Sequence, residues 1–424
     1  MPVDSAPIAG APTAVDVLVI GAGPAGAAAA YWLARDGHSA LIVERDRMPR
    51  EKACGDALTP RAMYRLTEMG LGEFAARLHP TSALRVTAGG NEVEVAWPQH
   101  PVYPPLGGVV RRSVLDDVVA RNATTAGAQL LQGHEALSPL IERGFCRGAV
   151  IAAPSGQELA VRAKYLLVAD GANSGFGRSL GTFRFGEWPF AEATRGYWAS
   201  SRSGEHVVES AVDITDRDGN ALPGYGWVFP VGDGTLNIGV GLVSTCRDFT
   251  SITTASLLDA FVQQIATRWK IDPAAPLAKP VSARIPMGGS VSPTAGPTFL
   301  VVGDAAASVN PFNGAGIEYA YETGRMAAEV VHEALVTDSP SVLQRYPQML
   351  HDRYGDYFKV ARLFDRVIGR PAVMRQLARA GASNRVLMDS ALRVTANMMR
   401  PDHLGPAEAA YRVATKLINL APNA

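Results

Sequence analysis

Residues 15–44 read VDVLVIGAGPAGAAAAYWLARDGHSALIVE, and this stretch decides the fold. It opens on residues 15–20, an apolar run rich in β-branched side chains, which is typical of a strand buried on both faces. A second run of this kind covers residues 40–44, and the alanine-rich segment between the two runs predicts a helix. The stretch therefore predicts a strand–turn–helix–strand unit in an α/β protein.

The turn between the first strand and the helix carries the pattern G-x-G-x-x-G at Gly21, Gly23 and Gly26. The first glycine permits the tight turn, the second lets the backbone approach a pyrophosphate, and the third lets the helix pack closely on the strand. Pro24 suits the first helical turn, where its missing N–H costs little. Glu44, at the end of the second strand, is placed to bind ribose hydroxyls. In this context the pattern predicts a dinucleotide site at the positive end of the helix.

The bulk composition is that of a soluble globular protein. The chain has 424 residues, of which 47% are hydrophobic and 19% charged, and its formal net charge is zero. The length predicts two or three packed units. A net charge of zero gives no overall field that would attract nucleic acid, so no nucleic-acid partner is expected. Residues 1–12 are expected to be a flexible lead-in without the features of a signal peptide, and no apolar run predicts a membrane span.

The three cysteines, Cys54, Cys146 and Cys246, lie far apart, without the paired spacing of a zinc site or a disulfide framework. The eight histidines show no metal-ligand spacing either, so no metal is expected. This cysteine usage favours a reducing, cytoplasmic setting. Cys54 lies in KACGDALTP, residues 52–60, and three roles are open to it: a reactive thiol, a metal ligand, or a small residue in a loop that covers a cofactor.

Two later segments repeat the pattern of an apolar strand followed by small residues. KYLLVADGANS, residues 164–174, ends its strand just before Asp170. In residues 298–331, TFLVVGDAAASVNPFNGAGIEYAYETGRMAAEVV, the strand leads to Asp304, and the Gly-Ala-Gly at 314–316 opens a long helix. Glycines at a helix start leave a concave row of N–H donors for an anionic or electron-rich group. Both segments therefore predict further contacts to a cofactor.

In this order and spacing, the three segments resemble the FAD-binding signatures of the p-hydroxybenzoate-hydroxylase-like flavoproteins. KACGDALTPRA, PGYGWVFP and GDAAASVNPFNGAGIEYAYETGR also resemble motifs of the geranylgeranyl reductase family, and within it the actinobacterial menaquinone-reductase-like branch. The likeness runs from about residue 13 to the C-terminal helices. It implies a Rossmann-like FAD-binding domain of the glutathione-reductase type (ββα), with an inserted antiparallel-sheet substrate domain and C-terminal helices.

The expected boundaries follow from these segments. The discontinuous FAD-binding domain is expected to comprise residues 13–80, 108–184 and 285–340. The substrate-binding sheet is expected to comprise residues 81–107 and 185–284, and a helical region to comprise residues 341–424.

The resemblance also implies the residues that bind FAD. The residues at its pyrophosphate and adenosine end would be Gly21, Gly23, Pro24, Ala25, Gly26, Glu44 and Arg45. The residues near the isoalloxazine would be Cys54, Gly55, Pro311, Gly314, Ala315, Gly316 and Ile317. Asp304 would bind ribityl or pyrophosphate-linked oxygens, and Asp170 and Gly303 would also contact the cofactor. Arg112, in RSVLDDVV, matches an Arg-x-x-Leu-Asp signature of the family and should contact the cofactor. The alternative for Arg112 is a surface cation before a helix.

The middle of the chain changes character. Strand-like runs appear between residues 185 and 284, and the GDG at 232–234 predicts a hairpin. Tyr225, Trp227 and Phe229 match the family's Tyr-x-Trp-x-Phe-Pro motif and point to one face of a strand, because side chains alternate with period two. An aromatic face with two polar tips suits an elongated isoprenoid chain. The alternative is that these rings pack against a helix as core residues.

The C-terminal part reads as helical and basic. Residues 351–400 contain ten Lys or Arg residues against four Asp residues, interspersed with apolar side chains. Basic amphipathic helices can lie on an anionic membrane surface, which a lipid-quinone substrate would make useful. Peripheral contact with the inner face of the membrane is therefore one interpretation. The other is a solvated basic face that covers the remaining domains.

Two reaction classes follow from the resemblance. The first is reduction of C=C bonds in the isoprenoid chain of a prenylated lipid or quinone, of menaquinone or geranylgeranyl type. Reduced FAD would supply the hydride, and NADPH or another electron donor would bind transiently. Cys54, Tyr225 and Trp227 are the candidate catalytic residues, Cys54 and Tyr225 as proton donors. The second class is oxygen insertion by a monooxygenase acting on an aromatic or polyketide-like substrate. A flavin-binding module without catalysis is a third interpretation.

Two departures from the family pattern keep the second class open. The usual Cys-Gly-Asp-Gly or Cys-Gly-Gly-Gly appears here as Cys54-Gly55-Asp56-Ala57. The common Asn-Gly-Glu-Gly appears as Asn313-Gly314-Ala315-Gly316. Loss of a glycine and of a carboxylate beside the flavin could alter the substrate or the chemistry.

Overall fold

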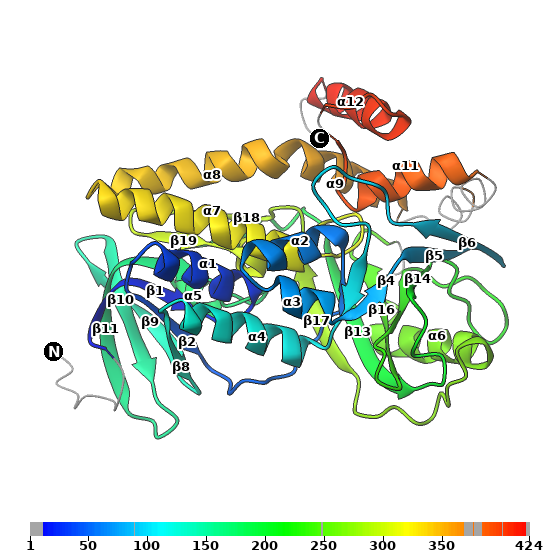
Figure 1. Ribbon diagram of the computed structural model, residues 1–424, viewed down its shortest axis with the longest axis horizontal. Helices are drawn as coiled ribbons and strands as arrows, with labels where there is room; N and C mark the ends of the chain where they lie inside the picture. Colours follow the sequence, from blue (N-terminus) through cyan, green and yellow to red (C-terminus); the bar gives the residue numbers. More distant parts are fainter. Residues whose placement is uncertain are drawn as a thin grey trace.

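The computed structural model describes residues 12–88, 90–246, 249–364, 376, 384–400 and 402–420, together with the helical backbone of 365–368. Residues 1–11, which make up nearly all of the predicted flexible lead-in, lie outside the described residues. In Figure 1 the described chain forms a layered α/β part on one side and an antiparallel sheet on the other, with the C-terminal helices across the top. This arrangement confirms the predicted fold class.

The first sheet has seven strands and a parallel centre. Its order is β8 (Gln129–Gln132), β2 (Ala40–Glu44), β1 (Ala14–Ile20), β11 (Glu158–Val168), β10 (Phe145–Ala152) and β9 (Glu135–Glu142), with β19 (Phe299–Val301) also paired to β11. All pairs are parallel except β11–β10 and β10–β9. The apolar runs read from the sequence are therefore central strands, buried on both faces as a parallel sheet requires.

Three helices pack on one face of this sheet: α1 (Pro24–Arg35), α4 (Arg112–Thr125) and α7 (Ile317–Val336). Small residues let α1 and α7 approach closely, since a Cβ atom at Gly324 would lie 2.4 Å from the carbonyl oxygen of Ala25. The short α5 (Gly175–Ser179) contributes Phe176 to the apolar cluster on the opposite face. The alanine-rich sequence of α1 thus serves tight packing between helices.

The second sheet also has seven strands, and it is antiparallel except for one pair. Its order is β17 (Val281–Pro286), β13 (Phe190–Ala199), β16 (Thr235–Val243), β15 (Tyr225–Pro230), β14 (Val207–Ala211), β5 (Ala83–Ala88) and β6 (Asn91–Ala96). The parallel pair is β14–β5. The hairpin predicted at residues 232–234 is confirmed, because β15 and β16 pair on either side of it. Helix α6 (Thr254–Trp269) covers one face.

Short elements connect the two sheets. Two of them, β3 (Ala57–Leu58) and β4 (His79–Thr81), pair with β7 (Gly107–Val109), and β12 (Phe183–Arg184) pairs with β18 (Val291–Ser292). The segment after β3 forms α2 (Pro60–Glu68) and α3 (Gly72–Ala76). Thr59 caps α2 by accepting a hydrogen bond from the Ala62 N–H, and Pro60 occupies the first helical position.

The C-terminal region is helical. Its elements are η2 (Pro340–Gln344), α8 (Arg345–Leu350), the short π-helix η3 (His351–Gly355), α9 (Asp356–Ile368), α11 (Arg385–Thr395) and α12 (Pro406–Asn419). Helix α8 lies along α7, α11 packs on β6, and α12 rests on α9 and α11 as the outermost element at the top of Figure 1. Among the predicted basic residues, the side chains of Arg366, Arg370, Arg375 and Arg379 lie outside the described residues.

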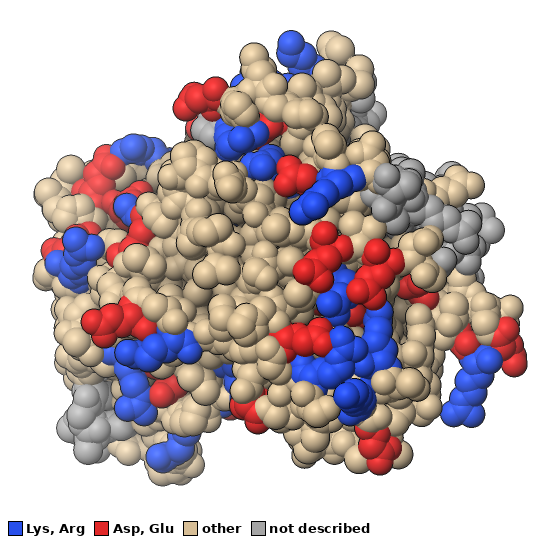
Figure 2. Space-filling view, turned by 45° about the vertical axis from the view of Figure 1, so that its right-hand side comes forward, with Lys and Arg blue, Asp and Glu red and all other residues tan. Residues whose placement is uncertain are grey.

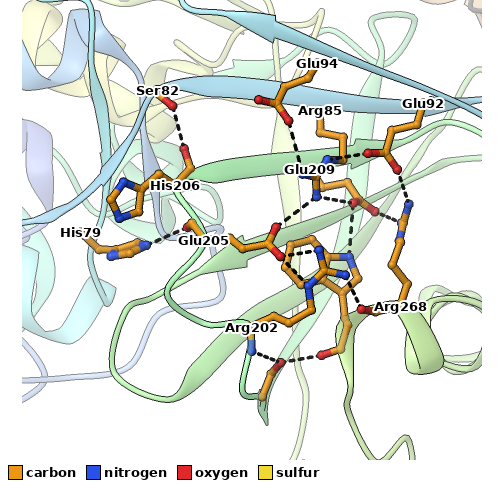
Figure 3. Close-up of polar contacts among 12 residues, drawn as sticks. His79, Ser82, Arg85, Glu92, Glu94, Arg202, Glu205, His206, Glu209 and Arg268 are labelled. Atoms are coloured by element: carbon orange, nitrogen blue, oxygen red, sulfur yellow. Dashed lines mark hydrogen bonds and ion pairs between the residues drawn. The ribbon is translucent and has the colours of Figure 1, made fainter.

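A network of ion pairs joins the second sheet to its covering helix (Figure 3). Arg85 of β5 lies 2.9 Å from Glu92 and 3.2 Å from Glu205. Arg268 of α6 pairs with Glu92 at 3.3 Å and with the buried Glu209 of β14. Figure 2 shows charged side chains of both signs gathered on the side of the molecule that carries this sheet. The network therefore holds the β5–β6 hairpin against α6.

Candidate active site

The glycine pattern lies where β1 ends, and two of its glycines are required by close backbone contacts. Gly21 has a φ of +102°, and a Cβ atom there would lie 2.4 Å from the carbonyl oxygen of Ala169. A Cβ atom at Gly26 would lie 2.0 Å from the carbonyl oxygen of Gly21. These contacts seat the start of α1 on the turn, with Pro24 at its first position.

Gly23, by contrast, faces open space. Among the described residues beyond its chain neighbours, the only atom within 4 Å of a Cβ placed there is a guanidinium nitrogen of Arg50, at 3.9 Å. The N–H groups of Ala25 and Gly26 are in the first turn of α1, where they have no partner within the helix. An open backbone position beside unpaired N–H groups and a cation fits the pyrophosphate of FAD.

Arg50 is a residue that the sequence analysis missed. Its guanidinium lies 3.4 Å from Glu44 and 3.2 Å from Asp116 of α4. No pattern marks this cation, because it lies in an irregular segment and its second partner is 66 residues away. The pairing places Arg50 between the predicted ribose and pyrophosphate positions.

Glu44 and Arg45 follow at the end of β2. The Glu44 carboxylate is buried and accepts hydrogen bonds from the N–H groups of Ala22, at 2.8 Å, and of Asp46, at 3.1 Å. The side chain of Arg45 is 73% exposed and lies 3.7 Å from the Asp46 carboxylate. Glu44 is thus held beside the glycine turn, whereas the cation of Arg45 points to solvent.

The segment after β19 folds into a short 3-10 helix, η1 (Gly303–Ala306), that touches α1. Gly303 has a φ of +62°, and a Cβ atom there would lie 2.7 Å from the Cβ of Ala25. Asp304 accepts a hydrogen bond from Lys52 at 3.0 Å. Burial alone would raise the pKa of Asp304, but the Lys52 ammonium lowers it, so this carboxyl stays ionised. The ion pair brings residues 52–56, which we call the Cys54 loop, next to η1.

Residues 310–316 form the glycine-rich loop before α7, and this loop lies between η1 and the second sheet. A Cβ atom at Gly316 would lie 3.4 Å from a carboxylate oxygen of Asp304, and one at Gly314 would lie 3.0 Å from the Tyr225 hydroxyl. Ala315 donates its N–H to the Asn313 side chain at 2.9 Å. The other predicted residues here, Pro311 and Ile317, lie in the same loop and at the first position of α7. The loop therefore joins two predicted parts of the site.

Asp170 follows β11 next to Gly21, where an added Cβ atom would lie 3.4 Å from the Asp170 Cα. Its carboxylate accepts hydrogen bonds from the Ser174 hydroxyl, at 2.7 Å, and from the Phe176 N–H, at 2.9 Å. The side chain therefore orders the start of α5, and any contribution of Asp170 to FAD binding stays a prediction.

Arg112 is not a surface cation, so that alternative is wrong. It is 2% exposed, and its guanidinium makes two hydrogen bonds of 2.9 Å to Asp116 one turn along α4. Its backbone N–H donates to the Asp56 carboxylate at 3.3 Å, which places its side chain beside Cys54. Burial would lower the pKa of Arg112, but Asp116 raises it well above its usual range. Arg112 thus links α4 to the Cys54 loop as a permanent cation.

Tyr225, Trp227 and Phe229 form one aromatic row on β15, as predicted. Neighbouring ring centroids are 6.0 and 6.1 Å apart. The row lies over the Cys54 loop, since a Cβ atom at Gly55 would lie 2.7 Å from the Phe229 ring. Helix α6 covers the opposite face, where Gly226 and Val228 meet it. Phe229 also joins an apolar cluster that includes residues of α11, so the row combines a core end with an end facing the glycine-rich loop.

Comparison with known proteins decides the family. Residues 14–354 match the family model described as FAD binding domain. The chain belongs to this FAD-binding family. It is 39% identical over 388 residues to the menaquinone reductase of Mycobacterium tuberculosis (strain ATCC 25618 / H37Rv), covering 91% of this chain and 92% of that protein. It is 30% identical over 330 residues to the digeranylgeranylglycerophospholipid reductase of Methanosarcina mazei, with 78% of each chain covered.

Solved structures share the fold. A geranylgeranyl bacteriochlorophyll reductase-like protein of Thermoplasma acidophilum superposes with a TM-score of 0.78 at 22% identity, covering 95% of this chain and 99% of that one. A flavin-dependent brominase superposes with a TM-score of 0.74 at 20% identity, covering 96% and 100%. Identities this low establish the fold alone. The same fold therefore occurs in a geranylgeranyl bacteriochlorophyll reductase-like protein and in a flavin-dependent brominase.

Within this FAD-binding family, the two departures noted from the sequence have local explanations. Ala57 begins β3 and pairs with Val109, so it occupies an extended position that does not need glycine. Ala315 contributes backbone groups to the glycine-rich loop, where its carbonyl accepts a hydrogen bond from the Asn310 N–H at 2.9 Å. Neither departure breaks the loops that surround the predicted flavin position.

Proposed function

We propose that this flavoenzyme reduces C=C bonds in the isoprenoid chain of a prenylated lipid or quinone. The observation that carries the proposal is the aromatic row of Tyr225, Trp227 and Phe229, which lies between the Cys54 loop and the glycine-rich loop before α7. A row of neighbouring aromatic rings offers a long apolar wall with few hydrogen-bond demands, which suits an isoprenoid chain. Relatives named as menaquinone reductase and digeranylgeranylglycerophospholipid reductase support the same substrate class.

Each part of FAD would be held by residues of a different loop. The turn of Gly21, Gly23 and Gly26 with Arg50 would bind the pyrophosphate, and Glu44 the ribose. The isoalloxazine would lie beside the glycine-rich loop and Cys54. When bound and reduced, FAD supplies the hydride for the alkene.

The chain's own residues orient the substrate and exclude water. An isolated alkene is a poor electrophile, so it must be held close to the hydride source in a dry site. Cys54 carries its thiol beside the Arg112 cation and beneath the Phe229 end of the aromatic row. Cys54 is therefore our first candidate for delivering a proton to the second alkene carbon, and Tyr225 is the second.

The product mass tests this reaction class. Anaerobic incubation of menaquinone or geranylgeranyl diphosphate with the chemically reduced enzyme should add two hydrogen atoms per reduced bond. NADPH tested in place of the chemical reductant would identify the donor. A gain of one oxygen atom in air, with no reduced product without air, would replace the proposal by the monooxygenase alternative.

We also propose that α12 makes peripheral contact with the inner face of the membrane, where such a substrate resides. Val413, Leu417 and Leu420 are 58%, 63% and 81% exposed and lie on one face of the helix at spacings of four and three. The exposed charged residues on the helix, Arg412 and Lys416, are both cations. An exposed apolar stripe beside cations fits an anionic lipid surface. In the described residues no helix is long and apolar enough to cross a bilayer.

Vesicle flotation tests this contact. The chain should float with phosphatidylglycerol vesicles at low salt, and the triple variant Val413→Ser, Leu417→Ser, Leu420→Ser should bind roughly tenfold less or weaker still, because it loses its apolar anchor. The matched control is Leu137→Ser, Ile141→Ser on β9, two exposed apolar residues that lie far from α12 along the chain. Equal flotation of the triple variant and the unaltered chain, or no flotation of either, would remove the membrane contact.

A further inference from the structure

A buried hydrogen-bond network lies behind the Cys54 loop, and Asn237 of β16 is at its centre. Asn237 is fully buried. In the sheet register it pairs with Tyr197 of β13 on one side and with Phe229 of β15 on the other. Its side chain therefore lies on the same face as the aromatic row, at the point where the Cys54 loop crosses the sheet.

Asn237 contacts both walls of the predicted reaction site. Its side-chain oxygen accepts a hydrogen bond from the Trp227 indole N–H at 2.8 Å. Its amide nitrogen lies 3.4 Å from the Cys54 carbonyl oxygen, to which it donates. This assignment is fixed by chemistry, because an indole N–H can only donate and a carbonyl can only accept. Gly239 makes the contact possible, since a Cβ atom there would lie 2.1 Å from the indole.

Asp56 holds the other side of the loop. It is fully buried, and its carboxylate accepts hydrogen bonds from the Tyr197 hydroxyl at 2.6 Å and from the backbone N–H of Arg112 at 3.3 Å. The Tyr197 ring is itself enclosed by two guanidinium groups, of Arg111 at 4.2 Å and Arg195 at 4.6 Å from the ring centroid. The loop is thus anchored at two nearby points, Cys54 and Asp56.

We propose that Asn237 is a positioning residue for the reaction: it sets the distance between the Trp227 ring and the Cys54 backbone, with Asp56 as the second anchor of the loop. The inference rests on the proposed function, because its consequence for turnover needs a substrate that lies between these two walls. Neither residue touches the reacting atoms. They act by fixing groups that do, and displacing such a group by about 1 Å can cost a factor of about 100 in rate.

The test compares Asn237→Leu with Thr194→Val, a control in the same sheet. Thr194 of β13 is buried and makes two hydrogen bonds of 2.7 Å, to Thr254 and Ser282, on the side of the sheet that faces α6. Both variants lose buried hydrogen bonds, so both should lose stability. Only Asn237→Leu should lower kcat by about 10- to 100-fold at a nearly unchanged KM, with FAD still bound.

Limited trypsin digestion gives a readout that needs no substrate. Arg50 and Lys52 offer cleavage sites just before Cys54, and freeing the loop should speed cleavage there by roughly tenfold in Asn237→Leu but not in Thr194→Val. Because this readout is independent of the reaction class, it separates failure of this inference from failure of the proposed function. Equal cleavage in the two variants would overturn the inference, as would equal kcat.

A double-mutant cycle with Trp227→Phe tests whether Asn237 acts through the indole. Trp227→Phe keeps Asn237 and an aromatic ring in place but removes the indole donor. If Asn237 acts through Trp227, adding Trp227→Phe to Asn237→Leu should change little. The kcat of the double variant should then be at least about half the kcat of Asn237→Leu alone. Fully multiplicative losses would show that the two residues act independently and would overturn the inference.

Discussion

Replacing Gly26 by valine is expected to abolish FAD binding. The Cβ atom of any side chain at this position would lie 2.0 Å from the carbonyl oxygen of Gly21, a backbone atom that cannot rotate away. Relief requires the start of α1 to move off the turn, which carries the unpaired N–H groups away from the pyrophosphate. The affinity for FAD should fall by about 100-fold or more, and the variant should purify without the yellow flavin absorption.

The control for this variant is Gly186→Ala. Gly186 has no positive φ, and a Cβ atom added there would have no atom of the described residues within 4 Å beyond its chain neighbours, so a methyl group meets open space. It should purify yellow, with unchanged flavin content. If Gly26→Val fails to fold, Gly26→Ala, with the same first clash and less bulk, is measured by flavin titration. A flavin content in either Gly26 variant equal to that of Gly186→Ala would contradict the expected role of α1 in holding the pyrophosphate.

Replacing Glu322 by leucine is expected to cost about 3–5 kcal/mol of unfolding free energy. Glu322 lies buried on α7 and pairs with two arginines of α2, Arg61 and Arg65. Arg61 is also buried, and its guanidinium lies 4.5 Å from the centroid of the Tyr319 ring. Leucine would leave the buried Arg61 charge without its ion-pair partner, which is far costlier than losing an exposed pair. Denaturant unfolding followed by circular dichroism measures the loss.

Glu329→Leu on the same helix is the matched control. Glu329 pairs with Arg325 at 3.0 Å, but its side chain is 52% exposed, so its loss should cost no more than about 1 kcal/mol. The two variants should also differ with pH. Burial alone would raise the pKa of Glu322, but the Arg61 charge lowers this pKa from 4.5 to about 2. Its contribution is therefore complete above pH 4.5 and is lost as the pH falls through about 2.

The pH dependence of the stability difference between the unaltered chain and Glu322→Leu can contradict this prediction. The stability difference between the unaltered chain and Glu322→Leu should shrink between pH 4.5 and 2, because the protonated glutamic acid no longer compensates Arg61. A difference that stays constant over this range, or equal costs for Glu322→Leu and Glu329→Leu, would mean that the buried pair does not stabilise α2 on α7.

The sequence predicted those parts of the site that are encoded locally. The turn from Gly21 to Gly26 was predictable because its contacts are made within a single strand–turn–helix unit. The single-face arrangement of the Tyr225 row was predictable because strand side chains alternate. The two glycine-bearing segments after β11 and β19 each follow an apolar strand of the central sheet, as predicted, and their contact with a cofactor stays a prediction.

Side-chain contacts between distant segments, to other side chains or to the backbone, were not predictable. Lys52 meets Asp304 across 252 residues, and Asn237 meets Cys54 across 183. Hydrophobic periodicity reports which face of an element is buried, but not which polar side chains will meet once the elements pack. The same limit applied to Arg112, whose buried position depends on the Cys54 loop as well as on its own helix.

The parallel pair β14–β5 has a consequence for how this chain is made. Val207 pairs with Ala83, so the second sheet stays incomplete until the ribosome has added more than a hundred further residues, including the strands that finish most of the first sheet. The β5–β6 hairpin must wait, since an isolated two-stranded hairpin has little stability of its own. Truncation after β12 would leave that hairpin without its neighbour. The strands of the two sheets thus alternate along the chain. A continuous fragment that contains all strands of one sheet must also contain strands of the other.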